Sequence, residues 1–272
     1  MRVILKGIQT KDFIHPDDEK GLNRMNAIPG MKRFLADTIS NLREKFTSVE
    51  MYGDGINISE HAYGELHSLL KEAVEILDYE TIPYFSLTWH YNISVGSEGA
   101  NNPRVTALSG AVDLLENEEL LFLLGHEIGH IKAGHKPYQN LLISFYTPFM
   151  QMVPNAEVWL GLLRPLLLQW YRLSDLTADR AGLLVCQDMN VALRAMIKMS
   201  GLPKKYYQSI HPDSILKQAT CFEQQNKGFA ESIIENLSIN TACAPWLVVR
   251  AAHLYRWYKS GDYTNILNKY SK

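Results

Sequence analysis

The sequence predicts an α+β fold that is mainly α-helical and contains one small β-sheet. Apolar residues recur at helical spacing in the first and last thirds of the chain, and two short strand-like runs stand between these parts. A chain of 272 residues, 46% of them hydrophobic, is long enough to bury a full core. We therefore expect a single domain over 1–272, with a helical N-terminal part to about residue 80, a core at about 81–185 and a helical C-terminal part from about 186.

The N-terminal part is predicted to contain two long helices. After Pro29-Gly30, apolar residues follow at steps of four, three and four, which is the spacing of one helix face: Leu35, Ile39, Leu42 and Phe46. Ser59 is a candidate N-cap for the second helix. The apolar stripe of that helix consists of Leu66, Leu69, Leu70, Ala73, Val74 and Leu77.

The predicted sheet directly precedes the strongest predicted helix. Strand-like runs at Tyr84–Tyr91 and Arg104–Leu108 flank the Gly- and Asn-rich link 96–103. The helix then begins at Asn117, because a capping Asn followed by two Glu suits the positive end of the helix dipole. We expect it to end near Gly134.

The next segment, 138–170, is unusually apolar, with Glu157 and Arg164 as its only charged residues. No clean apolar stretch reaches the roughly twenty residues of a spanning helix, because three prolines interrupt the segment: Pro148, Pro154 and Pro165. We expect a buried or surface-docked helical hairpin; peripheral membrane contact through 138–170 is the alternative. Two further helices are predicted at Trp246–Lys259 and Asp262–Leu267.

Charge and cysteine content exclude several classes of protein. Lys and Arg total 27 against 29 Asp and Glu. Proteins that bind nucleic acids usually have a strongly basic face, so we expect no nucleic-acid partner. The three cysteines lie far apart without a C-x-x-C pair, which argues against a disulfide framework or a cysteine zinc cluster. The first residues contain no apolar stretch long enough for a secretory signal. We therefore expect a cytoplasmic protein.

One motif has a spacing that a metal site requires, with two histidines four residues apart: His126-Glu127-Ile128-Gly129-His130. Residues four apart on a helix differ by roughly 40°, so both imidazoles leave the same face. Two neutral imidazole nitrogens that converge in this way suit a zinc ion. Glu127, beside them, is placed to take the proton of a metal-bound water.

A third metal ligand must come from elsewhere. His135 lies nine residues after His126, about 180° round a continued helix, and the ten-residue offset of a three-histidine motif falls on Lys136. Asp175 and Asp179 share one face of a half-buried helix. One of these carboxylates can reach the metal while the other accepts the spare N–H of a ligating His, so Asp175 is a better candidate for the third ligand than His135.

Together these motifs resemble the HtpX-like zinc metallopeptidases, relatives of the CAAX prenyl protease, and are most similar to the soluble bacterial branch of that family. The resemblance rests on HEIGH at 126–130 and on S-D-L-T-A-D-R-A-G at 174–182. It extends over nearly the whole chain through Phe13-Ile-His-Pro-x-Asp, Asn92 to Gly96, Ser109-Gly-Ala-Val-Asp-Leu-Leu, Glu119-Leu through His135, and Arg250.

The resemblance implies zincin-like catalytic helices beside a small sheet whose edge strand holds the substrate in extended form. Asn92, Ser94 and Gly96 fall in the corresponding stretch, where main-chain pairing would bind peptide. By the family pattern, zinc is held by three residues, His126, His130 and Asp175. The same pattern gives Glu127 as general base, Asp179 as the carboxylate behind a ligand, and Arg250 as a further catalytic residue.

Two positions depart from the family pattern. Its third ligand is usually Glu, and Asp175 is one methylene shorter. The family commonly has His-Pro before its C-terminal helix, where this chain has Ala244-Pro245. The loss of that His would remove an oxyanion donor, for which Arg250 or His211 would compensate.

We therefore predict a zinc-dependent endopeptidase that hydrolyses a peptide or protein substrate. Glu127 activates the metal-bound water and passes its proton to the leaving amine. The alternative is a zinc-binding scaffold of little or no activity, which binds peptide but does not turn it over.

Overall fold

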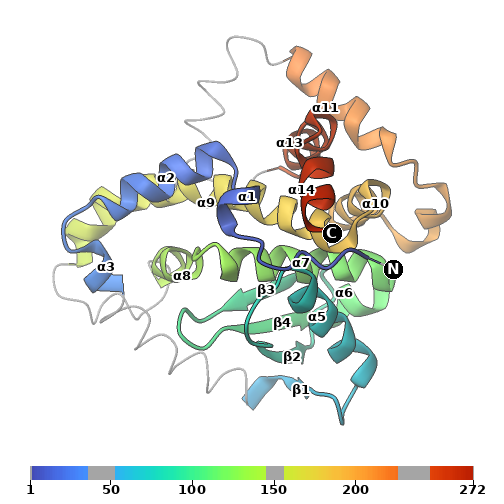
Figure 1. The fold of residues 1–272 in the computed structure, drawn as a ribbon, viewed down its shortest axis with the longest axis horizontal. Helices are drawn as coiled ribbons and strands as arrows, with labels where there is room; N and C mark the ends of the chain where they lie inside the picture. The colour runs from blue at the N-terminus through green and yellow to red at the C-terminus, as the bar shows by residue number, and fades with distance from the viewer. Residues whose placement is uncertain (1, 36–52, 145–155, 226–245, 272) are drawn as a thin grey trace.

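The computed structural model describes residues 2–35, 53–144, 156–225 and 246–271. Helices dominate these residues, and a small sheet lies early in the chain order (Figure 1). The elements are α1 (Thr10–Phe13), α2 (Pro16–Asn26), α3 (Met31–Phe34), β1 (Ile56–Ile58), α5 (Gly64–Ile76), β2 (Tyr84–Thr88), β3 (Val95–Glu98), β4 (Arg104–Leu108), α6 (Ser109–Leu114), α7 (Asn117–Lys132), α8 (Lys136–Ser144), α9 (Ala156–Cys186), α10 (Met189–Met199), η3 (Lys204–Ser209), α11 (Asp213–Gln225), α13 (Leu247–Ser260) and α14 (Asp262–Tyr270). The predicted α+β, mainly helical fold class is confirmed.

The four strands form one mixed sheet in the order β1-β2-β4-β3. β2 and β4 are parallel, with Phe85 opposite Val105, whereas β1 and β3 run antiparallel to their neighbours. β3 is therefore an edge strand, and it contacts α7. In Figure 1 the sheet lies on one side of α7, and α9 with the C-terminal helices lies on the other.

Local signals explain both ends of α7. Its N-cap is Glu116, one residue before the predicted Asn117. The main-chain N–H of Glu116 donates to Glu119 Oε2 at 2.9 Å, as in a capping box. At the other end the chain leaves the helix through Gly134, whose φ of 72° is easily adopted by glycine. The expected end near Gly134 is correct.

Glycines allow α7 and α9 to pack closely. A Cβ added at Gly125 would lie 2.6 Å from the Cβ of Val185, and one added at Gly129 would overlap the Ala181 methyl group. In the opposite direction, a Cβ at Gly182 would lie 2.7 Å from the Phe122 carbonyl oxygen. Small residues on both helices thus bring the two backbones together.

Three local predictions were wrong. Pro165 does not break the apolar segment but lies inside α9, a helix of 31 residues; Leu167 and Trp170, just after it, are buried and favour continuation. Ser59 does not cap α5, since it pairs with Ala62, and the helix begins after Tyr63. The strand β1 was not predicted, and β2 ends at Thr88 rather than at residue 91.

Other predicted elements agree with the structure as far as it describes them. α13 and α14 match the two predicted C-terminal helices. The helix predicted over 31–46 begins as α3, and its residues from 36 onward lie outside the described residues, as do Pro148 and Pro154. Within the described part of the chain, no helix is both long and apolar enough to cross a membrane.

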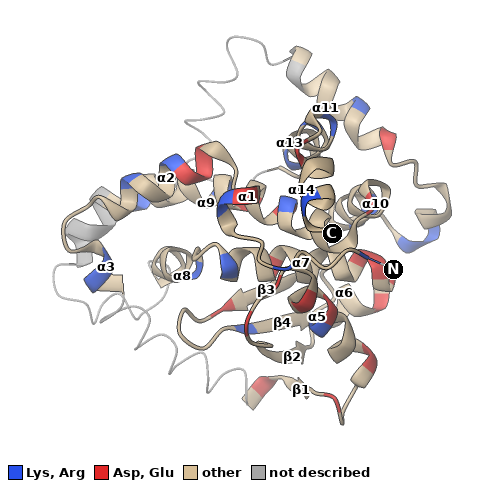
Figure 2. Cartoon of the chain, in the orientation of Figure 1, with Lys and Arg blue, Asp and Glu red and all other residues tan. Residues whose placement is uncertain are grey.

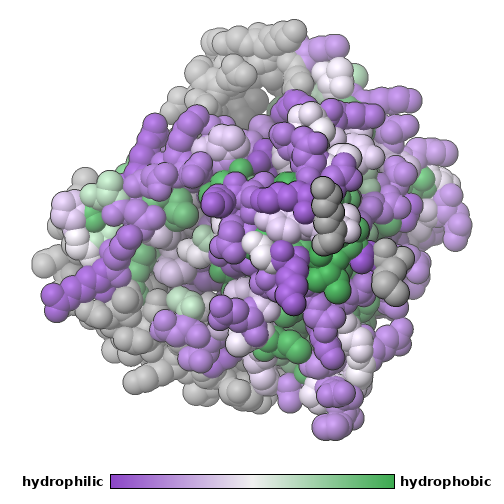
Figure 3. Space-filling view, in the orientation of Figure 1, coloured by the Kyte–Doolittle hydropathy of each residue, from purple (hydrophilic) through white to green (hydrophobic). Residues whose placement is uncertain are grey.

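Two hydrophobic clusters fill the interior. The larger one joins α5, the sheet, α7, the second half of α9, α10 and α13. The smaller one lies among α2, α3, α8 and the first half of α9, around the buried Trp170. Cationic and anionic residues are interspersed along the helices (Figure 2), and the face of the molecule seen in Figure 3 is largely hydrophilic with scattered apolar patches. α9 thus connects both clusters.

Candidate metal centre and active site

The two histidines of the predicted motif converge as their spacing requires. His126 Nε2 and His130 Nε2 lie 3.1 Å apart on one face of α7. Together with Glu127 they are the one group of potential metal ligands found among the described residues. Burial, followed by the nearby charge of Lys136, holds the pKa of His130 well below its usual value, which favours the neutral imidazole that binds metals.

Asp175 approaches this pair from α9. Its Oδ1 lies 3.3 Å from His130 Nε2, although Asp175 is not part of the group formed by His126, Glu127 and His130. Two tetrahedral ligands at about 2.0–2.1 Å from one zinc ion are about 3.3 Å apart, so both separations fit donors that share an ion. Burial raises the pKa of Asp175 against the lowering effect of Arg250; such a buried carboxylate gains from a cation beside it.

Asp179, one turn further along α9, lies behind His126. Its Oδ1 is 3.0 Å from His126 Nδ1, and Arg250 donates to both of its oxygens, at 2.5 and 2.8 Å. Burial alone would raise the pKa of Asp179, but Arg250 holds it at about 2. The carboxylate is therefore ionised and accepts the spare N–H of His126.

Glu127 is fixed by two residues that the sequence did not indicate. The Ser97 hydroxyl donates to Glu127 Oε2, and Lys136 Nζ lies 3.2 Å from the same oxygen. Burial raises the pKa of Glu127, but Lys136 and His126 hold it below its usual value. Glu127 Oε1 lies 3.9 Å from His126 Nε2, on the side of the metal ligands.

His135 lies behind His130 rather than among the ligands. Its Nδ1 is 2.9 Å from His130 Nδ1, and its Nε2 is 3.1 Å from Asp18 Oδ2. Burial raises the pKa of Asp18, but the interaction with His135 contributes to holding it below its usual value.

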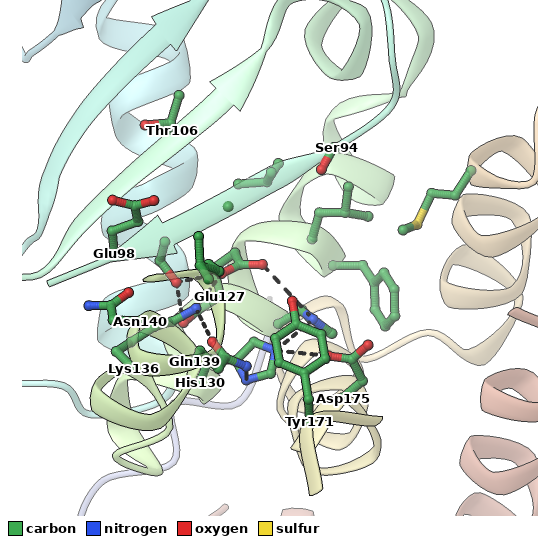
Figure 4. A pocket seen from close by; sticks show the side chains of 18 of the residues that line it. Ser94, Glu98, Thr106, Glu127, His130, Lys136, Gln139, Asn140, Tyr171 and Asp175 are labelled. Carbon is green, nitrogen blue, oxygen red and sulfur yellow. Dashed lines mark hydrogen bonds and ion pairs between the residues drawn. The ribbon is translucent and has the colours of Figure 1, made fainter. Parts of the chain in front are cut away.

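These groups open into a cleft of about 540 Å³ along the edge strand. In Figure 4, Glu127 and His130 lie in its middle, with Lys136 and Asn140 on one side and Asp175 on another. β3 supplies one wall, from Val95 to Glu98, and pairs with β4 through its other side. The cleft therefore runs along an exposed sheet edge beside the metal ligands.

The candidate substrate residues are divided between two cavities. Ser94 and Gly96 line the cleft, whereas Asn92 lines a neighbouring cavity that shares Ser94 and Met199 with it. The observed strand begins at Val95, three residues later than the stretch beginning at Asn92 that the resemblance implies.

The candidates for the missing oxyanion donor differ in position. Arg250 lines the cleft, but its donors face Asp179 and Asp175. His211 is exposed and does not line the cleft. Ala244 lies outside the described residues.

Ser97 and Lys136 were missed for different reasons. The ten-residue offset of a three-histidine motif, counted from His126, falls on Lys136, and a lysine there was considered only as evidence against a third histidine ligand. Because Gly134 turns the chain after α7, Lys136 folds back toward Glu127. Ser97 lay in a link predicted as loop, and its strand register could not be read from a Gly-rich sequence.

Comparisons with known proteins agree with this arrangement. Residues 64–220, more than half of the chain, match the model of peptidase family M48. The chain is 28% identical over 277 residues to the "Plastoglobule-localized metallopeptidase 48, chloroplastic" of Arabidopsis thaliana, an alignment that covers 98% of this chain and 78% of that protein. No solved structure matches the chain. With its paired histidines, central glutamate and family match, the chain belongs to peptidase family M48 and is a metallopeptidase.

Proposed function

We propose that this metallopeptidase is a zinc-dependent endopeptidase that uses Glu127 as its general base. The observation that carries the proposal is the spacing of the donor atoms. His130 Nε2 lies 3.1 Å from His126 Nε2 and 3.3 Å from Asp175 Oδ1, beside the edge of a sheet.

Zinc fits the donor set of this site. Two imidazoles and one carboxylate leave a fourth position open, which is the pattern of catalytic zinc sites. When bound there, zinc would supply Lewis acidity to the scissile carbonyl and to the attacking water. His126, His130 and Asp175 would hold it, and the shorter Asp side chain reaches because the glycines of α7 bring α9 close.

Glu127 divides its two oxygens between two tasks. Ser97 and Lys136 hold Oε2, so the carboxylate cannot rotate freely. Oε1 remains on the side of the metal ligands. We infer that Oε1 takes the proton of the attacking water and passes it to the leaving amine.

The substrate is proposed to be an extended polypeptide segment. The edge of β3 that lines the cleft can pair with a peptide main chain while tolerating different side chains. Arg250 takes part by holding Asp179, and through it His126, in place. We propose no nucleic-acid partner, and a cytoplasmic location remains a prediction. The plastoglobule location in the relative's name belongs to that protein.

Membrane contact through 138–170 also remains a prediction. Part of that segment, 145–155, lies outside the described residues. Before it, Tyr138, Leu141 and Leu142 are buried in the smaller hydrophobic cluster. Those three side chains are therefore not available to a membrane in this structure.

The test compares the wild type with Glu127→Gln. The amide keeps the size and hydrogen bonding of Glu127 but cannot accept the water's proton, so cleavage of a peptide library should fall about 10²- to 10⁴-fold. Zinc content, measured by elemental analysis, should stay at about one ion per chain, as expected for a catalytic site. Equal and negligible cleavage by both proteins, with zinc bound, would instead favour the scaffold alternative. Cleavage that survives in Glu127→Gln would refute the assigned base.

A further inference from the structure

We propose that His135 and Asp18 are positioning residues that orient the metal-binding imidazole of His130 through a buried chain of close polar contacts. The inference rests on the proposed zinc site. It gives a role to two residues that the peptidase mechanism above does not use.

The chain of contacts is continuous and buried. His130 Nδ1 lies 2.9 Å from His135 Nδ1, and His135 Nε2 lies 3.1 Å from Asp18 Oδ2. Asp18 and His135 have no exposed surface, and His130 is almost fully buried. Water therefore does not compete for these contacts.

The direction of the hydrogen bonds follows from the chemistry of the neighbours. A histidine that binds metal through Nε2 carries its proton on Nδ1 and must donate it. The other contact of His130 Nδ1 is Gln139 Nε2 at 3.2 Å, which is itself a donor, because Gln139 Oε1 already accepts from Lys136 at 2.9 Å. His135 Nδ1 is thus the acceptor, and the proton of His135 lies on Nε2, which faces Asp18 Oδ2 at 3.1 Å in a close polar contact that does not have the angle of a regular hydrogen bond.

Asp18 is held as the acceptor at the end of this chain. Trp170 Nε1 donates to its Oδ1 at 2.8 Å, and the Thr177 hydroxyl donates to its Oδ2. A buried carboxylate is costly unless its oxygens are satisfied, and here the two donors from α9 satisfy one oxygen each. Asp18 is the last residue of the Phe13-Ile-His-Pro-x-Asp motif, so a role at the metal site accounts for the Asp of that N-terminal motif.

The two histidine ligands are therefore backed in different ways. His126 reaches its carboxylate, Asp179, directly at 3.0 Å. His130 reaches Asp18 only through a second imidazole. Since α2 carries Asp18 and packs on α9, the N-terminal helix contributes to the geometry of the metal site (Figure 1).

The test measures zinc affinity in variants of the full chain. His135→Phe keeps a ring against Trp170 but removes both nitrogens, and zinc Kd should rise about 10- to 100-fold, as for other losses behind a metal ligand. His135→Asn keeps an acceptor near the position of Nδ1 and should bind zinc more tightly than His135→Phe. The visible spectrum of the cobalt-substituted protein should also change in His135→Phe, because the ligand imidazole is no longer fixed.

A purely structural role predicts a different result. It would lower the melting temperature of the metal-free protein and leave zinc Kd unchanged. The control Ile266→Ala on α14 should give that result, because its side chain is buried in the larger hydrophobic cluster and does not line the cleft. That result in His135→Phe would overturn the inference. If this variant does not fold, Asp18→Asn is measured in the same way and should raise zinc Kd.

The outcomes separate this inference from the proposed function. A wild type that binds no zinc would overturn both. Zinc binding that depends on His135, in a protein without peptidase activity, would support the positioning role and leave only the endopeptidase proposal refuted.

Discussion

Asp175 and Asp179 lie one helical turn apart on α9, and their surroundings differ. Asp179 is matched by two hydrogen bonds from Arg250, and its pKa is about 2. Asp175 has Arg250 only at 3.8 Å, and burial raises its pKa. The better-matched carboxylate is suited to hold a ligand, and the poorly matched one is suited to meet a cation.

This difference predicts opposite effects of two alanine variants. Asp175→Ala should lose most bound zinc while the metal-free protein keeps its melting temperature, because a poorly compensated buried carboxylate is removed. Asp179→Ala should raise zinc Kd only about 10- to 100-fold, but it should destabilise the metal-free fold by about 3–5 kcal/mol, since the buried Arg250 loses the carboxylate to which it donates two hydrogen bonds.

Zinc titration and thermal unfolding of the chelator-treated proteins check both effects. The reverse order, with Asp179→Ala losing more zinc than Asp175→Ala, would exchange the two roles.

At the scale of elements, the contact between α7 and α9 sets the distance between the histidines and the carboxylates. Gly125, Gly129 and Gly182 leave no room for a side chain at this contact. The histidines come from one helix and Asp175 from the other, so a small change in helix separation changes the donor spacing directly.

Gly129→Ala should therefore damage the metal site without changing any ligand. The added methyl group would overlap Ala181 and move α9 away, and overpacking of this kind typically costs about 1–3 kcal/mol. We expect lower thermal stability together with a zinc Kd raised by about tenfold or more. Gly64→Ala, at the start of α5, is the matched control, because this glycine has no positive φ and nothing lies within 4 Å of its added Cβ. Equal zinc affinity in Gly129→Ala and the wild type would contradict this account.

At the scale of the whole molecule, the cleft continues beyond the metal ligands. The neighbouring cavity shares Ser94 and Met199 with it and is also lined by Leu202 and Tyr207. A peptide paired along Ser94–Glu98 covers about five residues at about 3.3 Å each, and the neighbouring cavity adds room for more.

Cleavage should accordingly depend on peptide length. Extending a good substrate from about four to about eight residues should raise kcat/KM at least about tenfold, because remote binding energy contributes to the transition state. Leu202→Ala should reduce this gain for the long peptide and leave the short one unaffected. Steady-state kinetics on a length series measures both, and equal rates at all lengths would argue against an extended cleft.

The sequence predicted the parts of this molecule that depend on local spacing. The fold class and the convergence of His126 and His130 follow from helical periodicity, and both are observed. Pro165 was misjudged because burial of the residues after it outweighs the local cost of proline. Ser97 and Asp18 meet their partners only through tertiary packing, so spacing along the chain carries no signal for those contacts. Lys136 meets Glu127 through the turn after α7, which helical spacing does not predict.

The single helix α9 also determines where this chain can change length. It carries Asp175, Thr177 and Asp179 within five residues, facing the proposed ion, Asp18 and His126 in turn. One inserted or deleted residue before this group would rotate all three by about 100° about the helix axis, and every contact would be lost together. The exposed residues 100–102, by contrast, do not line the cleft at the metal site. Length variation among relatives should therefore collect in such links and avoid the stretch from Trp170 to Gly182.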